Sequence, residues 1–405
     1  MNAIPALDGL RALAVLLVIL FHAWTFVPGY IQPGQNAADY ALFYGKTGVQ
    51  LFFVLSGFLL FLPYAQWIFG LRERPSTLMF YKRRALRVGP AYWVSLVILI
   101  LTAPLTFAAL QDLAVHLVFL SNTSWQTAFS INGVYWTMAI EVQFYALLPA
   151  IAWATRALAL KIGALRSMLL IFCLLVLISL ISHALGNIAA LGAIPVFSTF
   201  LINYSSMPYW LAVFGCGIAC SVIYTYLTRV ERLKRRQARR IPGICTRLFV
   251  LGVLLALALA FVPLLHKLFV LDLLFGLAYA GMLMGVLFGV PILRKPFESR
   301  AMRFVGLISY SFYIWHRVVL HILSSRIYVV ARVVLRLVGQ HHAVLATAAQ
   351  VAVLFILGTL ASTIVSYLSY QALERPFINA RKKSHETTAP SPLSLGYPQV
   401  AQQVD

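Results

Sequence analysis

The sequence predicts an all-α, polytopic membrane protein: a helical bundle of about ten transmembrane helices with both termini in the cytoplasm. Hydrophobic residues make up 61% of the 405 positions, and the mean hydropathy of +0.86 lies well above that of soluble globular domains. These residues gather in segments of about 20, the length that an α-helix needs to cross the hydrocarbon core. Basic residues concentrate in alternate loops, as the positive-inside rule requires.

Ten segments satisfy the length requirement, and polar, Gly/Pro-containing or charged stretches separate them. The first segment is not expected to be a cleaved signal peptide, because Asp8 and Arg11 interrupt it and no small-x-small cleavage site follows. The predicted spans are residues 8–27, 46–69, 88–108, 134–155, 167–185, 206–227, 247–264, 269–292, 303–323 and 345–372.

The positive charge of the chain follows the predicted topology. With these spans, 26 of the 32 Lys and Arg residues fall on the side of the N-terminus, which is therefore predicted to be cytoplasmic. The net charge of +21 is thus mainly a topology signal, with some attraction for anionic lipid headgroups or anionic ligands. No nucleic-acid partner is expected.

The chain is predicted to contain one integral-membrane domain, residues 1–383, and a disordered cytoplasmic tail, residues 384–405. Residues 112–121 are expected to form a short interfacial helix, and residues 229–247 a solvated basic linker. Cysteines in or beside spans are interpreted as small apolar side chains, because no Cys/His ligand spacing accompanies them. No metal site is predicted.

Asp8, Arg11 and His22 lie on one stripe of the first span. Eleven residues correspond to about three turns of helix, and Asp8 precedes Arg11 by three residues. An ionisable group inside a bilayer costs about 2.5 kcal/mol or more and usually marks a functional site. The structural alternative is an Asp8–Arg11 pair at the cytoplasmic rim and a hydrogen-bonded core histidine. His22 lies deep, roughly 21 Å along the helix from Asp8, and imidazole suits proton transfer near neutral pH.

Thr137, Glu141 and Tyr145 recur every four residues and share one face of the fourth span. This span enters from outside, so Glu141 is predicted about 10 Å from the outer end, near the depth of His22. A carboxyl group buried in a bilayer needs a partner. The alternative role for Glu141 is a neutral hydrogen bond that holds helices together.

Tyr313 and His316 belong to an aromatic stretch, residues 309–316, of the ninth predicted span. This span enters from inside near residue 303, which places His316 about 20 Å up. His22, Glu141 and His316 are therefore predicted to reach one level from three helices. A packing role within the aromatic cluster remains the alternative for His316.

Arg84 and Arg87 are three residues apart at the cytoplasmic entrance of the third span and share a helix face. Paired guanidinium groups suit phosphates, although a pure topology role is equally compatible. Gly48 and Gly57 in the second span are interpreted as positions where helices approach closely.

These motifs resemble those of the membrane-bound acyltransferase 3 family. The similarity rests on Arg11-x10-His22 within Leu-Asp-Gly-Leu-Arg-Ala, on the segment 48–58, and on Arg84-x-x-Arg87. It continues through Tyr135-Trp136 to Pro149 and through Ser-Tyr-Ser-Phe-Tyr-Ile-Trp-His at 309–316, in the family's order over roughly residues 5–375. Two positions depart from the usual pattern: Val142 replaces a second acidic residue, and Val318 replaces a proline.

The resemblance implies O-acyl transfer, commonly of acetyl, from an acyl-coenzyme A co-substrate to a hydroxyl group of a carbohydrate, glycolipid or natural product. It implies no permanently bound cofactor, and a bacterial cytoplasmic membrane as the location. On this basis Arg84 and Arg87 are expected to bind the coenzyme phosphates, and His22 to act as base or acyl carrier.

The remaining site residues receive supporting roles under the same hypothesis. Arg11, kept charged by Asp8, would orient the donor, and Glu141 would tune the histidine. Tyr145, Tyr313 and His316 are expected on the substrate side of the site.

A proton-coupled secondary transporter or flippase is the alternative, with His22, Glu141 and His316 as its proton relay. The absence of matching Gly/Pro-broken helices in the two halves of the sequence disfavours it.

Overall fold

The computed structural model describes residues 4–27, 37–102, 104, 106–190, 204–231, 240–338 and 343–379. All regular elements in these ranges are helices, which confirms the all-α prediction. Eight helical segments of the described chain are long and apolar enough to cross a membrane. The helices α4 (Thr77–Ile100) and α16 (Ser309–Val338) are also long, but their more polar sequences keep them out of that group.

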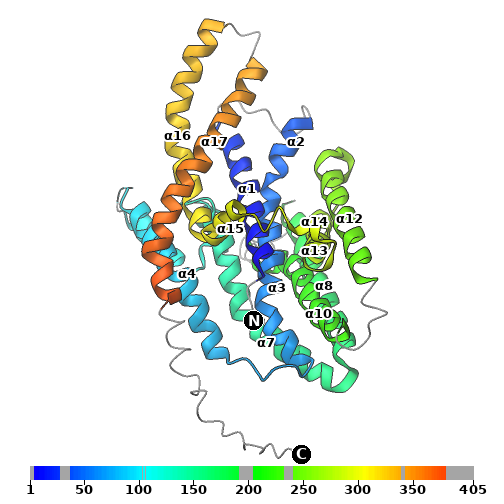
Figure 1. The fold of residues 1–405 in the computed structure, drawn as a ribbon. Coiled ribbons are helices and arrows are strands. Elements are labelled where there is room, and N and C mark those ends of the chain that lie inside the picture. Colours follow the sequence, from blue (N-terminus) through cyan, green and yellow to red (C-terminus); the bar gives the residue numbers. More distant parts are fainter. Residues whose placement is uncertain are drawn as a thin grey trace, which may run out of the picture.

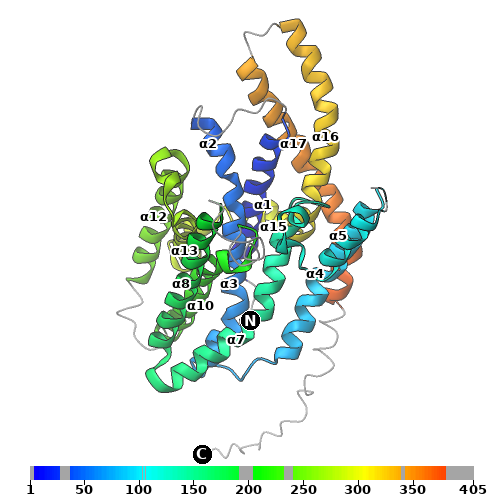
Figure 2. The same ribbon diagram turned by 180° about the vertical axis from the view of Figure 1, so that it is seen from behind.

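The long helices run roughly side by side along one axis (Figures 1 and 2). The start of α1 (Pro5–Thr25) and the end of α17 (Ala343–Ser369) lie toward the same, lower end of the bundle in Figure 1. The end of α1 and the short helix α2 (Ala37–Phe43) lie toward the opposite end. The cytoplasmic location of the termini stays a prediction, as does the number of about ten spans.

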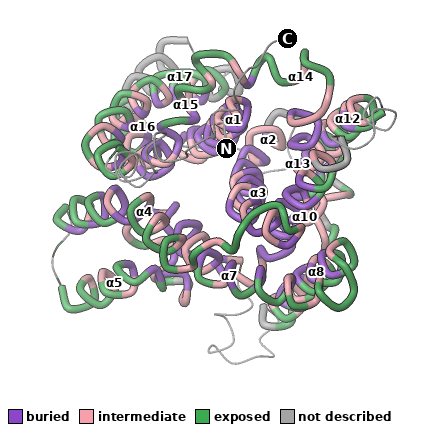
Figure 3. Tube along the Cα trace, turned by 60° about the horizontal axis from the view of Figure 1, so that its bottom comes forward, coloured by how far each residue is buried: buried purple, intermediate pink, exposed green. Residues whose placement is uncertain are grey.

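The centre of the bundle is α3 (Gly48–Ile68), which packs against α10 (Met207–Glu231). A Cβ atom at Gly57 would overlap the Phe214 carbonyl oxygen, and one at Gly217 would overlap the Val54 carbonyl oxygen. Only glycine permits this backbone contact, so the packing role predicted for Gly57 is confirmed. Figure 3 shows the buried side of these helices turned inward.

The other helices surround this central pair (Figure 3). On one side lie α8 (Ala164–Ala190), α12 (Ile241–Phe261) and α13 (Leu271–Phe288). On the other side lie α4, α5 (Phe107–Leu117), α7 (Tyr135–Ile162), α16 and α17. The outward faces of α8, α12 and α17 are exposed and rich in leucine and isoleucine, as lipid contact requires.

Helix α1 is held between α3 and α15 (Arg300–Leu307). A Cβ atom at Gly48 would overlap the Ala14 carbonyl oxygen, which confirms the packing role predicted for that glycine. A Cβ atom at Gly306 would likewise overlap the Asp8 carbonyl oxygen. These contacts fix the stripe of α1 that carries the ionisable residues.

Several predicted boundaries are wrong for local reasons. The predicted span 88–108 belongs to α4, which starts at Thr77 because the Ser76 hydroxyl accepts from the Met79 N–H as a helix cap, and which ends at Ile100. The predicted span 303–323 is broken at Ile308, so that α15 ends before α16 begins at Ser309.

Two further elements begin at other residues than predicted. The helix of the predicted span 247–264 begins six residues earlier, at Ile241, and α10 extends to Glu231, so helices occupy both ends of the linker expected at 229–247. The predicted interfacial helix 112–121 lies at Phe107–Leu117. The tail 384–405 and the central part of the linker lie outside the described residues.

Candidate functional site

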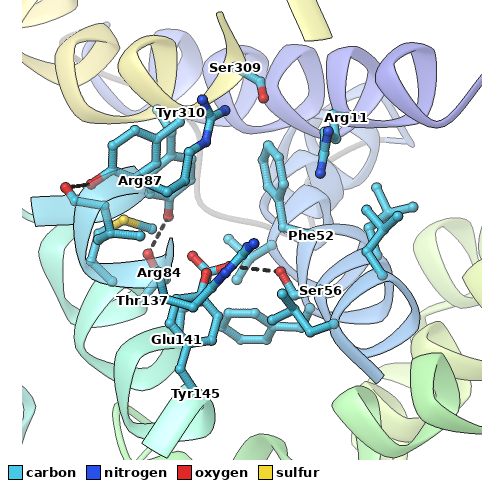
Figure 4. A pocket seen from close by; sticks show the side chains of 18 residues that line it. Arg11, Phe52, Ser56, Arg84, Arg87, Thr137, Glu141, Tyr145, Ser309 and Tyr310 are labelled. Atoms are coloured by element: carbon cyan, nitrogen blue, oxygen red, sulfur yellow. Dashed lines mark hydrogen bonds between the residues drawn. The ribbon is translucent and has the colours of Figure 1, made fainter. Parts of the chain in front are cut away.

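A cavity with about 820 Å³ of empty space, open solvent included, lies between α1, α3, α4, α7 and α16, and we call it the arginine cavity (Figure 4). It combines three guanidinium groups with one carboxyl group, three tyrosines and three smaller hydroxyl side chains. Those lining residues are Arg11, Arg84, Arg87, Glu141, Tyr145, Tyr310, Tyr313, Ser56, Thr137 and Ser309. The structure thus brings together six of the nine site residues predicted from the sequence.

Arg11 enters the cavity from α1, and its Nη1 donates to Asp8 Oδ1 at 3.0 Å. Both side chains keep about a third of their surface exposed, so this pair is a partly solvated one. The predicted Asp8–Arg11 pair is present, and Arg11 nevertheless lines the cavity. Asp8 therefore holds the guanidinium from outside the cavity.

Arg84 and Arg87 come from one face of α4, one turn apart. Arg84 forms no ion pair with any residue that the structure describes, and its guanidinium lies 6.0 Å from the Tyr145 ring centre. Its charge is therefore available to an anion in the cavity. Figure 4 shows Arg84 and Arg87 reaching into the space between α7 and α16.

Arg87 has a partner that sequence reasoning missed. Its Nη1 lies 2.7 Å from Glu374 Oε2, and Ser311 Oγ donates to Glu374 Oε1 at 2.6 Å. Glu374 is the last residue of a π-helical turn, Tyr370–Glu374, and its side chain is 1% exposed. The available signal was the position of this acidic residue, just beyond the last predicted span, residues 345–372.

Glu141 accepts from Ser56 Oγ at 2.7 Å across the α3–α7 interface. This bond shows that Glu141 does hold two helices together, while its side chain still lines the cavity (Figure 4). Thr137, one turn away on α7, donates to the Tyr313 hydroxyl at 2.9 Å. The two bonds fix α7 against α3 and α16 on either side of the cavity.

His22 and His316 meet outside the arginine cavity. His22 Nδ1 lies 3.2 Å from His316 Nε2 and 2.9 Å from the Val18 carbonyl oxygen. His316 Nδ1 lies 2.8 Å from the Tyr313 carbonyl oxygen. Because a carbonyl oxygen only accepts, both Nδ1 atoms carry the proton, and His316 Nε2 accepts from His22 Nδ1–H. This tautomer leaves His22 Nε2 as the unprotonated ring nitrogen.

His22, Glu141 and His316, all predicted to lie at one depth, therefore form two neighbouring groups and not one cluster. The two histidines bond to each other, whereas Glu141 bonds to Ser56 and faces the arginines. Tyr313 links the groups, since its side chain lines the cavity and its ring centre lies 5.6 Å from that of His316. The helical rise gives the depth of each residue along its helix, but it does not give the direction in which the side chain leaves the helix.

The arrangement suits the binding of a phosphorylated molecule next to a proton acceptor. Guanidinium groups bind phosphate oxygens with two parallel hydrogen bonds, and these bonds are strongest where water is partly excluded. No cluster of three metal-ligating side chains occurs in the described part of the chain. Charged and polar side chains inside a membrane bundle mark a functional site by default, because packing against lipid does not require them.

Comparison with known proteins gives a family for this arrangement. The acyltransferase domain family matches residues 4–371, which include every residue of the cavity and the histidine pair. ORF330 of Acidianus two-tailed virus is 26% identical over 319 residues, which cover 78% of this chain and 83% of that protein.

Two bacterial relatives have names that state an activity. The peptidoglycan O-acetyltransferase OatA of Listeria monocytogenes is 27% identical over 340 residues, 77% of this chain and 49% of its own length. The O-acetyltransferase OatA of Staphylococcus aureus is 31% identical over 163 residues, 36% of this chain and 24% of its own length. The chain thus spans about half the length of the Listeria protein and about a quarter of the length of the Staphylococcus protein. No solved structure matches the chain significantly. The extent of the family match shows that this chain is a multi-pass membrane protein of the acyltransferase 3 family.

Proposed function

We propose that the protein transfers an acyl group, in the simplest case acetyl, from acyl-coenzyme A to a hydroxyl group of a carbohydrate or glycolipid at a bacterial cytoplasmic membrane. Two observations outside the site support this proposal: the family match, and relatives named O-acetyltransferases. The single observation that carries it is the convergence of Arg11, Arg84 and Arg87 on one cavity beside the His22–His316 pair.

The donor is the ligand that the arginine cavity fits. Coenzyme A carries phosphates at one end and the reactive thioester at the other, so one end needs cations and the other needs a proton acceptor. Arg84 has a free charge, and Arg87 is oriented by Glu374. Arg11 comes from the opposite wall, so a phosphate between the walls would be held from two sides.

His22 is the proposed general base. In the bonded tautomer its Nε2 takes the proton of the acceptor hydroxyl, and the hydroxyl oxygen attacks the thioester carbonyl carbon. The carbon–sulfur bond then breaks, and the leaving thiolate takes the proton from His22 Nε2. This sequence yields one ester and one free thiol, and it needs no further reactant. It requires the acyl group to reach beyond the wall formed by Thr137 and Tyr313.

Glu141 is a second candidate base, favoured by a specific observation: it lines the arginine cavity itself, whereas His22 does not. Its carboxyl group accepts from Ser56 and bonds with Tyr145, and a carboxylate has further lone pairs for a substrate hydroxyl. The rates of acyl transfer in His22→Ala and Glu141→Gln distinguish the two roles.

The test of the reaction class uses the purified protein with labelled acetyl-coenzyme A. We expect release of free thiol that depends on enzyme and is accelerated by a hydroxyl-bearing acceptor. Movement of a labelled substrate across proteoliposomes that depends on a proton gradient, without thiol release, would favour the transporter alternative and contradict the proposal.

A further inference from the structure

A second cavity, with about 790 Å³ of empty space, open solvent included, lies at the end of the bundle where α1 ends and α3 begins; we call it the polar cavity. It shares no lining residue with the arginine cavity. Its walls come from the turn Tyr44–Thr47, the first turn of α3, and the start of α13, with further side chains from α8 and α10. Of its lining residues, only Gln50 belongs to a segment that carries the family resemblance, residues 48–58.

Asp272 is the centre of its hydrogen-bond network. Gln50 Nε2 donates to Asp272 Oδ1 at 2.8 Å, and the Tyr209 hydroxyl donates to Asp272 Oδ2 at 2.9 Å. His183 Nε2 lies 3.7 Å from the same Oδ2. The carboxylate is thus held by three helices, at the N-terminal end of α13, where the helix dipole favours negative charge. It retains lone pairs for a further donor.

Two polar atoms of the lining residues remain without a partner among the described residues: Gln50 Oε1 and His266 Nε2. Gln50 is 1% exposed, and no described protein group donates a hydrogen bond to this amide oxygen. A buried acceptor without a partner costs about 1–3 kcal/mol. Such a group is characteristic of a site whose bonds are completed by a ligand.

Charge and aromatic rings define the ligand class. Lys46 and Asp272 line the cavity with opposite charges, so the occupant need not be charged. His266 lies with its ring centre 4.7 Å from that of Tyr44, and His183 is stacked on Tyr209 at 3.5 Å. Burial and the nearby Asp272 raise the pKa of Tyr204 well above its ordinary range, so its phenol stays a neutral hydrogen-bonding group.

A cavity that presents aromatic ring faces beside carboxylate and amide groups fits a sugar. A sugar ring presents C–H faces that stack on aromatic rings, and hydroxyl groups around its edge that donate and accept. Asp272 and Gln50 Oε1 would accept from such hydroxyls, and Lys46 would donate to them. A purely apolar lipid chain would leave these groups unpaired.

The polar cavity also lies against the part of α1 that carries His22. A Cβ atom at Gly45 in its wall would lie 2.6 Å from the Leu17 carbonyl oxygen and 3.1 Å from the Phe21 amide nitrogen. Phe21 immediately precedes His22. The wall of the cavity is therefore packed directly on the last turns of α1.

We propose that the polar cavity binds the sugar ring of the hydroxyl-bearing acceptor. The role of the bound sugar as acyl acceptor rests on the proposed function. The binding of a neutral sugar by Gln50, Tyr209 and Asp272 rests on the cavity alone.

The test measures binding of radiolabelled sugars to the purified full-length chain in lipid nanodiscs, without donor. The probes are a peptidoglycan disaccharide, methyl glucoside and methyl galactoside, with cyclohexanol as the apolar control. We expect saturable binding of at least one sugar, and at least a tenfold loss of affinity in Gln50→Leu and in Tyr209→Phe. Tyr209→Phe keeps the ring, so it serves if Gln50→Leu folds poorly.

The matched control is Gln371→Leu, the same substitution at a half-buried position of the π-helical turn that lines neither cavity. It should bind the sugar like the wild type. Wild-type affinity in both cavity variants, or no saturable binding of any of the sugars, would overturn the inference.

Thiol release from acetyl-coenzyme A, measured on the same samples, separates the two proposals. If the wild type releases no thiol while the cavity variants lose sugar binding, the proposed function fails and the sugar site stands. If thiol release is normal and sugar binding is unchanged in both variants, the sugar site fails alone.

Discussion

His316 Nε2 lies 3.2 Å from His22 Nδ1 and fixes the proton of His22 on that nitrogen. The Val18 carbonyl oxygen, 2.9 Å away, favours the same tautomer. His316 is itself 0% exposed and oriented by the carbonyl oxygens of Phe312 and Tyr313. The pair therefore holds the imidazole in the form in which Nε2 accepts a proton, and His316 is a positioning residue for His22.

Removing His316 should impair the reaction without abolishing it. In His316→Ala, His22 loses one of the two acceptors that fix its tautomer. We expect kcat to fall by about tenfold, less than the roughly 10²- to 10⁴-fold that proton-transfer catalysis contributes, because His22 itself remains. The pH at which kcat is half-maximal should shift as well, because the ring loses a neighbour. A steady-state pH profile measures both.

His316→Gln provides the conservative variant, because its amide oxygen accepts a hydrogen bond. It should recover part of the lost kcat. A purely structural role would instead give equal losses in the two variants, with an unchanged pH profile.

The arginine cavity predicts a selective effect on the donor. Arg84→Gln removes a charge that has no ion-pair partner in the described structure, so we expect KM for acetyl-coenzyme A to rise about tenfold, which corresponds to about 1.4 kcal/mol. The value of kcat at saturating donor should change much less. Initial rates at varied donor concentration measure this.

Arg83→Gln is the matched control, since Arg83 precedes Arg84 on the same helix but does not line the cavity. It should leave KM unchanged. Equal KM values in both variants and the wild type would show that Arg84 does not bind the donor and contributes only to membrane topology.

Much of this cavity was predictable from the sequence, because its residues occur in pairs one turn apart. Arg84 with Arg87, and Thr137 with Glu141 and Tyr145, share helix faces whatever the tertiary structure. Which faces meet was not predictable in the same way. The His22–His316 bond joins residues 294 positions apart, and only the packing of α1 against α16 determines it.

The boundaries failed where local capping overrode hydropathy. Hydropathy alone placed the start of the third span at Val88, whereas the Ser76 cap begins α4 eleven residues earlier. Glu374 was missed because a π-helical turn returns it to the interior. The polar cavity was missed because Gln50 and Asp272 come from helices far apart in the sequence.

The Arg87–Glu374 pair should contribute to stability. Glu374→Gln keeps the size of the side chain but removes the charge that Arg87 contacts at 2.7 Å. We expect the free energy of unfolding to fall by about 2 kcal/mol, below the loss of about 3–5 kcal/mol for a fully buried ion pair, because the Arg87 side chain is 29% exposed. Thermal unfolding of the detergent-solubilised protein, followed by tryptophan fluorescence, measures the change.

The control for this substitution is Glu298→Gln. Its pair with Arg294 is exposed and 3.9 Å long, so its loss should cost less than about 0.5 kcal/mol. A Glu374→Gln variant as stable as Glu298→Gln would show that the buried pair contributes nothing net.

The close approach of α3 and α10 should not tolerate a methyl group. Gly217→Ala would force its Cβ into the Val54 carbonyl oxygen, and we expect a destabilisation of about 2 kcal/mol or more from overpacking. The same unfolding assay applies. Gly243→Ala, where nothing lies within 4 Å of an added Cβ, should be neutral or stabilising, because alanine favours helix more than glycine does. Equal stability of the two variants would argue against the glycine contact.

The role of His22 is decided by the rate of acyl transfer in purified His22→Ala and Glu141→Gln, each matched to the wild type for amount and melting temperature. We predict that His22→Ala loses at least about 100-fold in kcat, whereas Glu141→Gln retains a larger share of activity. If His22→Ala transfers acetyl groups at the wild-type rate while Glu141→Gln is inactive, the intramembrane imidazole is not the base.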